Sequence, residues 1–201
     1  MLYFPLFTVA LATIFCTDKL ELHFFFNQFV GTADAFFKYL TYIGDGVFVI
    51  SFCLLLLFLN AQKSLTISIA YALSSLITQI CKYSYSAITN NNRPVFVFQQ
   101  ENIPLKTVPN VALHVNESFP SGHATAAFSL FFCLSFFSEN KLVKTVCFAS
   151  AVLIALSRVY LSQHFFEDIT AGSFIGILFS WWVCAYFYPK FNKLNKPVWK
   201  R

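Results

Sequence analysis

Three side chains near the end of the sequence have the types needed to handle an anion: a cation, an imidazole and a carboxylate. They are Arg158, His164 and Asp168. His164 and Asp168 are four residues apart, which places them on one face if the segment is helical. A carboxylate there fixes the tautomer of the imidazole and leaves the second ring nitrogen free as a nucleophile or base. Arg158 is a permanent cation whose planar fork suits phosphate oxygens, so the group fits an anion site or a structural ion cluster at a membrane edge.

The composition indicates that these groups belong to a membrane protein. Of the 201 residues, 57% are hydrophobic and only 11% are charged, whereas soluble domains carry about 25% charged residues. The mean hydropathy is +0.62. This length accommodates about six spans of roughly 20 residues each, so we predict an all-α membrane bundle that forms one domain over residues 1–201. The six cysteines show neither CxxC nor zinc-finger spacing, and they predict no disulfide framework and no metal site.

Apolar runs between polar breaks predict where the six spans lie. The first run is short for a span and lacks a basic leading segment, so a cleaved signal peptide is the competing interpretation. The predicted spans are residues 2–16, 47–59, 65–81, 120–137, 142–156 and 169–188.

Two segments between the spans have other patterns. In residues 18–43, apolar residues recur at three- and four-residue spacing between polar ones, which predicts an amphipathic helix in the membrane interface. Residues 83–119 are polar and carry three prolines and the triplet Asn90–Asn92. We predict that this stretch is the one long hydrophilic loop, and a long loop in a compact protein is usually functional.

The basic residues predict the orientation of the spans. With a cytoplasmic N-terminus, eight of the fourteen fall on the inner side, in short segments, and this distribution obeys the positive-inside rule. Those eight are Lys63, Lys141, Lys144, Lys190, Lys193, Lys196, Lys200 and Arg201. The same topology places Lys82, Arg93, His123, Arg158 and His164 together at the outer face.

Three blocks of the sequence now form an ordered series. They are Lys82…Arg93-Pro94, then Pro120-Ser121-Gly122-His123, then Ser157-Arg158-x5-His164-x3-Asp168. With these blocks the chain resembles the PAP2 superfamily, the type 2 phosphatidic acid phosphatases, which also includes bacterial non-specific acid phosphatases and vanadium haloperoxidases. The second and third blocks match the family pattern residue for residue, and the resemblance covers residues 82–168 in its motifs.

The first block departs from the family pattern, which has six residues between the lysine and the Arg-Pro pair. Here ten residues separate Lys82 from Arg93. The excess of four residues is close to one helical turn, so that Lys82 keeps its face and lies about 6 Å further away. Alternatively, Asn90–Asn92 is a looped insertion that restores the position. In the third interpretation Lys82 is a lysine that snorkels to the membrane interface.

The resemblance implies a catalytic role for three residues. His164 stands at the position of the family's nucleophile and would form a phosphohistidine. Asp168 would hold its ring and stabilise the developing positive charge. His123 would protonate the leaving oxygen and then take a proton from the hydrolytic water.

The remaining motif residues are expected to bind phosphate. Arg93, Arg158 and Lys82 would contact its oxygens as cations. Ser121 and Gly122 would offer amides at a helix start, where glycine permits a close approach. The resemblance requires no metal and no cofactor. We expect His23 and His114, which match no block, to be ordinary surface or interface residues.

Together these features predict an integral membrane phosphatase that acts at the outer leaflet, with no nucleic-acid partner. The resemblance implies phosphatidic acid, phosphatidylglycerol phosphate, undecaprenyl pyrophosphate or lipid A phosphates as substrates. The short chain suits a bacterial member in the inner membrane with its site facing the periplasm. Two alternatives stay open: a lipid phosphotransferase with the same site, and a non-enzymatic membrane protein that only holds an anion. Apart from Lys144, near the inner end of the fifth span, the predicted spans contain no Asp, Glu, Lys or Arg, which argues against a transport path.

Overall fold

The structure is a computed structural model that describes residues 17–194. Over this range the chain is helical and holds no β-strand. Its elements in chain order are α2 (Lys19–Asn27), α3 (Asp34–Leu40), η2 (Thr41–Gly44), α4 (Gly46–Leu59), α5 (Ala61–Ile88), α6 (Pro94–Gln100), α7 (Gly122–Phe136), α8 (Lys141–Tyr160), α9 (Phe166–Tyr186) and η3 (Tyr188–Leu194).

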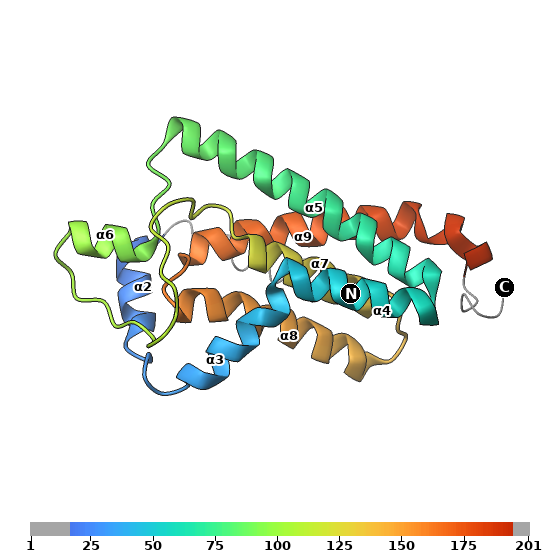
Figure 1. Ribbon diagram of the computed structural model, residues 1–201, viewed down its shortest axis with the longest axis horizontal. Helices are drawn as coiled ribbons and strands as arrows, with labels where there is room; N and C mark the ends of the chain where they lie inside the picture. Colours follow the sequence, from blue (N-terminus) through green and yellow to red (C-terminus); the bar gives the residue numbers. More distant parts are fainter. Residues whose placement is uncertain (1–16, 195–201) are drawn as a thin grey trace.

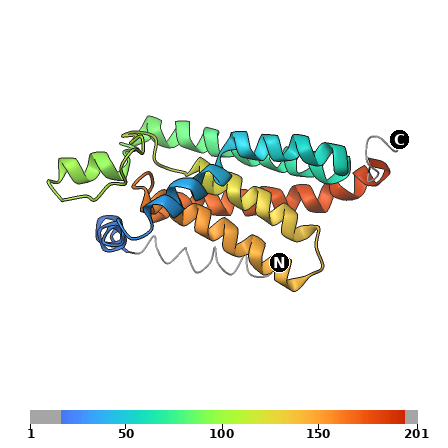
Figure 2. The same ribbon diagram turned by 60° about the horizontal axis from the view of Figure 1, so that its bottom comes forward.

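The long helices form one bundle, as the sequence predicts. Helices α4, α5, α7, α8 and α9 run along the long axis of the molecule (Figures 1 and 2). Helices α2, α3 and α6 gather at one end, on the left of Figure 1. At the opposite end η3 packs against the start of α5, where the Gln62 side-chain amide donates to the Tyr188 carbonyl at 2.7 Å. The all-α membrane bundle predicted from the sequence is therefore confirmed.

Three helices in the described chain are long and apolar enough to cross a membrane: α5, α8 and α9. A fourth span results if the segments Asp34–Gly44 and Gly46–Leu59, which meet at a bend of 58°, count as one. Helix α7 has 15 residues and is therefore about 22 Å long, shorter than the bilayer core of about 30 Å. The predicted first span, residues 2–16, lies outside the described residues.

Small residues let α7 and α9 pack closely. A Cβ added to Gly172 on α9 would collide with the Ser121 carbonyl oxygen, and one added to Gly176 would lie 2.7 Å from the Thr125 carbonyl oxygen. Small residues at four-residue spacing allow the backbones of membrane helices to approach each other in this way. The facing pairs continue with Ser129 and Ser180, then Cys133 and Cys184. This contact fixes the start of α7 beside the start of α9.

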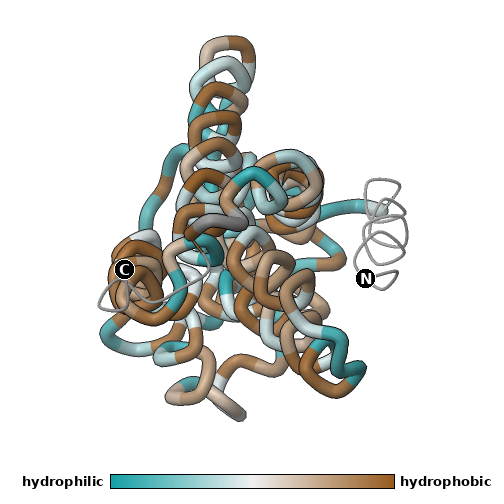
Figure 3. The backbone as a smooth tube through the Cα atoms, turned by 90° about the vertical axis from the view of Figure 1, so that its right-hand side faces the viewer, coloured by the Kyte–Doolittle hydropathy of each residue, from teal (hydrophilic) through white to brown (hydrophobic). Residues whose placement is uncertain are grey.

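The outside of the bundle is apolar. Large hydrophobic side chains are exposed along α4, and Val47, with 73% exposure, is the most exposed of them. Figure 3, a view along the long axis, shows mostly brown, hydrophobic helices. A surface of this kind suits lipid contact, since soluble monomers rarely expose such large apolar patches. Near the end of α9, Trp181, Trp182 and Tyr186 are exposed, as in the aromatic belts that lie at membrane–water interfaces.

The prediction of one amphipathic helix over residues 18–43 is wrong, because the chain turns between α2 and α3. Gly31 adopts φ +104° there, a conformation that side-chain-bearing residues rarely adopt. The Tyr160 hydroxyl accepts from the amides of Gly31 and Ala33, at 3.2 and 3.0 Å. The turn is thereby tied to the end of α8.

The predicted loop over residues 83–119 is also partly helical. Helix α5 continues to Ile88, and α6 begins at Pro94, a residue that is favoured at the first helical position because its missing N–H has no intrahelical partner there. The irregular part is confined to residues 101–121 and to the short link before α6. This link, residues 89–93, lies beside residues 115–118, with Asn92 bridged to Asn116.

Candidate active site

The corner between α8 and α9 sets the spacing of Arg158 and His164. The amides of Gln163 and His164 donate to the Arg158 carbonyl oxygen at 2.9 and 3.2 Å. The amide of Ser162 donates to the Val159 carbonyl oxygen at 2.9 Å. Ser162 has φ +51°, so the corner is a Schellman C-cap with serine where glycine is usual. Both residues of the third block are thus fixed by backbone hydrogen bonds.

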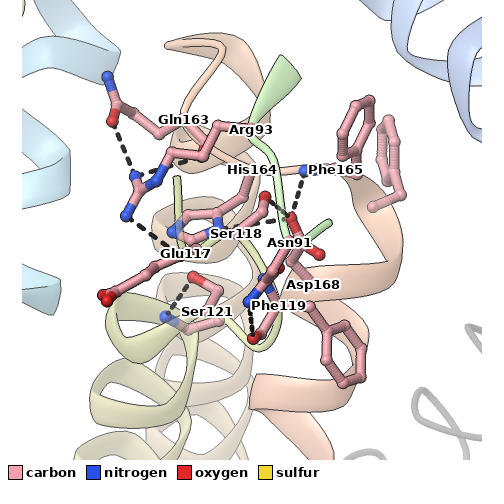
Figure 4. A network of polar contacts seen from close by, with 12 residues as sticks. Asn91, Arg93, Glu117, Ser118, Phe119, Ser121, Gln163, His164, Phe165 and Asp168 are labelled. Carbon is pink, nitrogen blue, oxygen red and sulfur yellow. Dashed lines mark hydrogen bonds and ion pairs between the residues drawn. The ribbon is translucent and has the colours of Figure 1, made fainter. Parts of the chain in front are cut away.

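Asp168 is the junction of the site. One of its carboxylate oxygens accepts from the Ser118 hydroxyl at 2.5 Å and from the Phe165 amide at 2.7 Å, and Figure 4 shows these contacts. The amide contact is one half of a helix capping box. Nδ1 of His164 lies 3.4 Å from the same oxygen, which is longer than a normal hydrogen bond. The arrangement orients Nδ1 toward the carboxylate and leaves Nε2 available.

The His164 ring is a buried, uncharged base. Burial, followed by the positive charges of Arg93, Arg158 and Lys82, lowers the pKa of His164 well below its ordinary value. The neutral form therefore persists at neutral pH, and a neutral imidazole is the form that can act as a nucleophile. The three cations that the sequence analysis assigned to phosphate lie near enough to exert this effect.

Arg158 supplies an unpaired donor to the site. Its side chain is buried at 8% exposure, and one terminal nitrogen donates to the Thr41 hydroxyl at 2.8 Å. Its Nε has no hydrogen-bond partner within the described chain. A buried unpaired donor requires an explanation, and an anion bound beside it satisfies the donor. Thr41 lies 117 residues from Arg158, and no sequence pattern pointed to it.

The side chains of Arg93 and Lys82 both contact the backbone at Glu117. Nζ of Lys82 donates to the Glu117 carbonyl at 2.8 Å, and Arg93 approaches that oxygen at 3.4 Å. Arg93 also donates from Nε to the Asn116 carbonyl at 2.8 Å and from Nη1 to the Gln163 side chain at 3.0 Å (Figure 4). Lys82 is 7% exposed. It therefore does not snorkel outward, and the third interpretation of the first block is wrong.

Asn91, which lies between Lys82 and Arg93 of the first block, makes several hydrogen bonds to Ser118 and Phe119. The Asn91 side chain accepts from the Phe119 amide at 2.6 Å and donates to the Phe119 carbonyl at 2.9 Å. The side chain also donates to the Ser86 hydroxyl at 2.9 Å. The backbone carbonyl of Asn91 accepts from the Ser118 amide at 3.1 Å. The Asn90–Asn92 segment therefore holds the backbone that leads into Pro120 and the second block (Figure 4).

The second block forms the first turn of α7. The Ser121 hydroxyl accepts weakly from the Ala124 amide at 3.4 Å. The Ser121 amide, which we expected to face an anion, donates instead to the Asp168 carbonyl at 3.0 Å. The next two amides, of Gly122 and His123, precede the first intrahelical bond and point out of the helix start. A Cβ on Gly122 would meet no atom within 4 Å, so open space adjoins these amides.

His123 faces a cavity of about 210 Å³ that Arg158 also lines. The bend between η2 and α4 lies directly behind His123. A Cβ on Gly44 would come within 3.2 Å of the His123 carbonyl oxygen and 2.7 Å of Ile154. Glycine thus permits this bend to close against the first turn of α7.

His23 contradicts its expected place at the surface. It is 1% exposed and packs edge-on against Phe98 and Phe165, with ring centroids 5.3 and 5.5 Å away. Neither ring nitrogen has a partner in the described chain, and burial lowers the pKa of His23 to about 4. His114, in contrast, is exposed as expected, and it lines the cavity beside His123.

Within residues 17–194, no three His, Cys, Asp or Glu side chains are grouped so that they could hold a metal ion. The polar end of the bundle thus combines two imidazoles, one carboxylate and three basic side chains. A site of this composition, at one end of an apolar helical bundle, has the chemical groups needed to hold an anion.

Comparison with known proteins identifies the family. A sequence model described as the PAP2 superfamily matches residues 63–192, which is more than half of the chain. The protein belongs to the PAP2 superfamily.

Two sequence relatives agree with this placement. The chain is 34% identical over 121 residues to the putative undecaprenyl-diphosphatase YbjG of Escherichia coli K12, a region that is 60% of this chain and 56% of that protein. It is 34% identical over 82 residues to phosphatidylglycerophosphatase B of Bacillus subtilis 168, covering 35% of this chain and 40% of that protein. The matched region thus spans about half the length of these relatives.

Two solved structures have the same fold. LpxE of Aquifex aeolicus superposes with a TM-score of 0.72 at 25% identity, covering 84% of this chain and 95% of that one. A transmembrane PAP2-type phosphatidylglycerolphosphate phosphatase of Bacillus subtilis superposes with a TM-score of 0.67 at 21% identity, covering 92% and 94%. The second likeness bears on the fold alone.

Proposed function

We propose that this protein hydrolyses the terminal phosphate of a membrane lipid phosphate or diphosphate, with His164 as the nucleophile. The observation that carries the proposal is the buried His164 with Nδ1 3.4 Å from the Asp168 carboxylate. Three basic side chains surround it, and the named relatives include a putative undecaprenyl-diphosphatase and a phosphatidylglycerophosphatase. A single catalytic domain over residues 1–201 is part of the proposal.

In the first step Nε2 of His164 attacks the phosphorus atom. The P–N bond forms while the bond from phosphorus to the lipid oxygen breaks. His123, protonated once the anionic substrate lies beside it, gives that proton to the leaving oxygen. Asp168 holds the His164 ring and stabilises its positive charge. Because the nucleophile and the leaving oxygen are in line, His123 acts on the side of phosphorus opposite His164.

In the second step water attacks the phosphohistidine. The water proton passes to His123, the P–N bond breaks, and inorganic phosphate leaves. Arg158, through its unpaired Nε, and Arg93 bind the equatorial oxygens in both steps, with Lys82 adding charge. Concentrated positive charge of this kind stabilises the transition state of phosphoryl transfer. The amides of Gly122 and His123 are placed to bind the same group. The proposed chemistry proceeds without a metal ion.

We place the site at the outer face of a bacterial inner membrane. The support is the distribution of basic residues in the sequence, together with the contacts that bring the site residues to one end of the bundle. Phosphatidic acid, phosphatidylglycerol phosphate, polyprenyl diphosphate and lipid A phosphates are the candidate substrates at that face.

Phosphate release from the purified protein tests this function. In detergent with EDTA, the protein should release phosphate from at least one of these lipids, and His164→Asn should abolish the release. A radiolabelled terminal phosphate should appear on the wild-type chain as an acid-labile, base-stable adduct that is missing from His164→Asn. Full activity of a folded His164→Asn variant would overturn the nucleophile assignment, and activity that requires added metal would overturn the metal-free chemistry.

A further inference from the structure

The cavity beside His123 extends well beyond the three sequence blocks. Its volume is about 210 Å³, and His123 and Arg158 line it while His164 does not. Most of its wall comes from two segments that the motifs do not include, the end of α3 with the following bend and residues 110–114. The polar side chains contributed by these segments are Lys38, Thr41, Tyr42, Asp45, Asn110 and His114.

The position of this cavity identifies which part of a substrate it receives. In the proposed reaction His164 and the leaving oxygen are on opposite sides of phosphorus, and His123 protonates the leaving oxygen. A cavity that includes His123 and excludes His164 therefore lies on the leaving-group side. Its contents are the atoms that remain attached to the lipid after the terminal phosphate is removed.

The charge of the cavity favours an anion there. Lys38 contributes a positive charge that the transferred phosphate does not use, Arg158 lies between the cavity and the transferred phosphate, and Asp45 contributes one negative charge. The start of α4 partly offsets the Asp45 charge, because this carboxylate caps the helix and accepts from the Val47 amide at 2.9 Å. Asn110, Tyr42 and His114 add neutral hydrogen-bonding groups. A leaving group that is a plain alcohol has no charge to pair with Lys38, whereas a phosphate does.

We propose that this cavity is a subsite for a second phosphate, one carried by the leaving group of the substrate. The inference rests on the proposed function and narrows it: lipid diphosphates, and lipid phosphates whose leaving group contains a phosphodiester, are preferred over simple lipid monophosphates. Lys38 is the specificity-determining cation, and His114 assists it.

The surroundings of Lys38 place this subsite at the level of lipid headgroups. Lys38 lies in the last turn of α3, just before the 58° bend into α4. Its neighbours Phe36 and Tyr39 are exposed, and aromatic side chains of this kind are enriched at membrane–water interfaces. The lipid chain of a bound substrate can then follow the exposed apolar face of α4 into the bilayer.

The test compares three substrates in mixed micelles: a polyprenyl diphosphate, phosphatidylglycerol phosphate and phosphatidic acid. Lys38→Gln should lower kcat/KM for the diphosphate by about tenfold relative to phosphatidic acid, since a charged hydrogen bond contributes on this order. Lys38→Arg, which keeps the charge, should restore most of the preference. Lys106→Gln is the matched control, because Lys106 belongs to the same polar end but does not line the cavity. In this variant the ratio of kcat/KM for the diphosphate to that for phosphatidic acid should stay at the wild-type value.

The arms of the experiment also distinguish the source of the second phosphate. Loss confined to the diphosphate means that the subsite binds a phosphate directly bonded to the first, and equal loss for phosphatidylglycerol phosphate means that it reaches a more distant phosphodiester. His114→Asn, at an exposed position, provides an independent variant if Lys38→Gln does not fold. Unchanged ratios in both variants would overturn the subsite. Failure of the proposed function is a different outcome, namely no phosphate release by the wild-type protein from any substrate.

Discussion

Two regions meet at the polar end of this protein and are held in place differently. Helices α7, α8 and α9 with the corner between α8 and α9, the helical frame, carry His123, Arg158, His164 and Asp168, and α7 and α9 pack through small residues. Residues 89–121, the loop frame, carry Arg93 and are held by side chains bonded to backbone groups, chiefly those of Asn91 and Lys82. Substitutions in the helical frame should therefore act through steric overlap or lost ion pairing. Substitutions in the loop frame should act through the loss of individual hydrogen bonds.

Asp168 joins the two frames, so its substitution should have the largest effect. Asp168→Asn replaces the carboxylate that faces His164 and accepts from Ser118 and Phe165. We expect kcat to fall by about a thousandfold, since an amide cannot stabilise the positive imidazole that forms. Steady-state phosphate release measures this effect. Glu167→Gln, the neighbouring carboxylate outside the site, should change kcat less than twofold, and a similar loss in both variants would refute the specific role of Asp168.

His23 tests the contact of α2 with both frames, because its ring packs against Phe98 of the loop frame and Phe165 at the start of α9. Its pKa of about 4 lies below the unfolded value of about 6.5. The unfolded chain therefore binds a proton first as the pH falls from 6.5 to 4, and the folded state loses up to about 3 kcal/mol over that window. This contribution is fully present above pH 6.5.

His23→Phe should remove that acid sensitivity while filling the same aromatic box. Melting temperatures in detergent should fall less steeply between pH 6.5 and 4 in the variant than in the wild type. The exposed His114 supplies the control, because His114→Asn should leave the wild-type slope unchanged. Parallel slopes for His23→Phe and the wild type would show that His23 is not buried in neutral form.

The close contact of α7 and α9 should be the next most sensitive feature. Gly172→Ala places a methyl group against the Ser121 carbonyl oxygen and should destabilise the fold by about 2 kcal/mol, a typical cost of overpacking. Gly122→Ala is a matched control for stability, since its Cβ meets no atom within 4 Å. Thermal unfolding compares the two. Equal melting temperatures would mean that the helical frame relaxes around the added methyl group.

The sequence predicted the helical frame better than the loop frame for a physical reason. Blocks two and three lie within short segments, so that the spacing of His164 and Asp168, together with apolar periodicity, is sufficient to place them. The structure brings all the predicted motif residues to one end of the bundle, and their roles stay predictions. The apolar periodicity of residues 18–43 does not reveal the Gly31 turn, although a glycine between two apolar runs is a turn signal.

Contacts between distant residues could not be derived from local patterns. Thr41 and Arg158 are 117 residues apart, and Ser118 and Asp168 are 50 apart. His23 lies between two phenylalanines that only the folded chain brings together. Such pairs have no spacing rule, because each depends on how whole helices pack. The sequence contained one usable signal for the loop frame, the departure of the first block from the family spacing.

A small substitution at Asn91 tests the role of the residues between Lys82 and Arg93, where the first block departs from the family spacing. Asn91→Asp keeps an acceptor for the Phe119 amide but loses both donated bonds, to the Phe119 carbonyl and to Ser86. Leaving a buried carbonyl without its partner costs about 1 kcal/mol or more, so we expect a lower melting temperature and a kcat reduced severalfold. KM should change little, because Asn91 positions the second block without contacting substrate. Asn90→Asp, one residue earlier and exposed, adds the same charge and should leave both quantities unchanged. Equal losses of melting temperature and kcat in the two variants would show that the added negative charge causes them. Lys82 and Arg93, and not Asn91, would then be the residues that hold the loop frame in place.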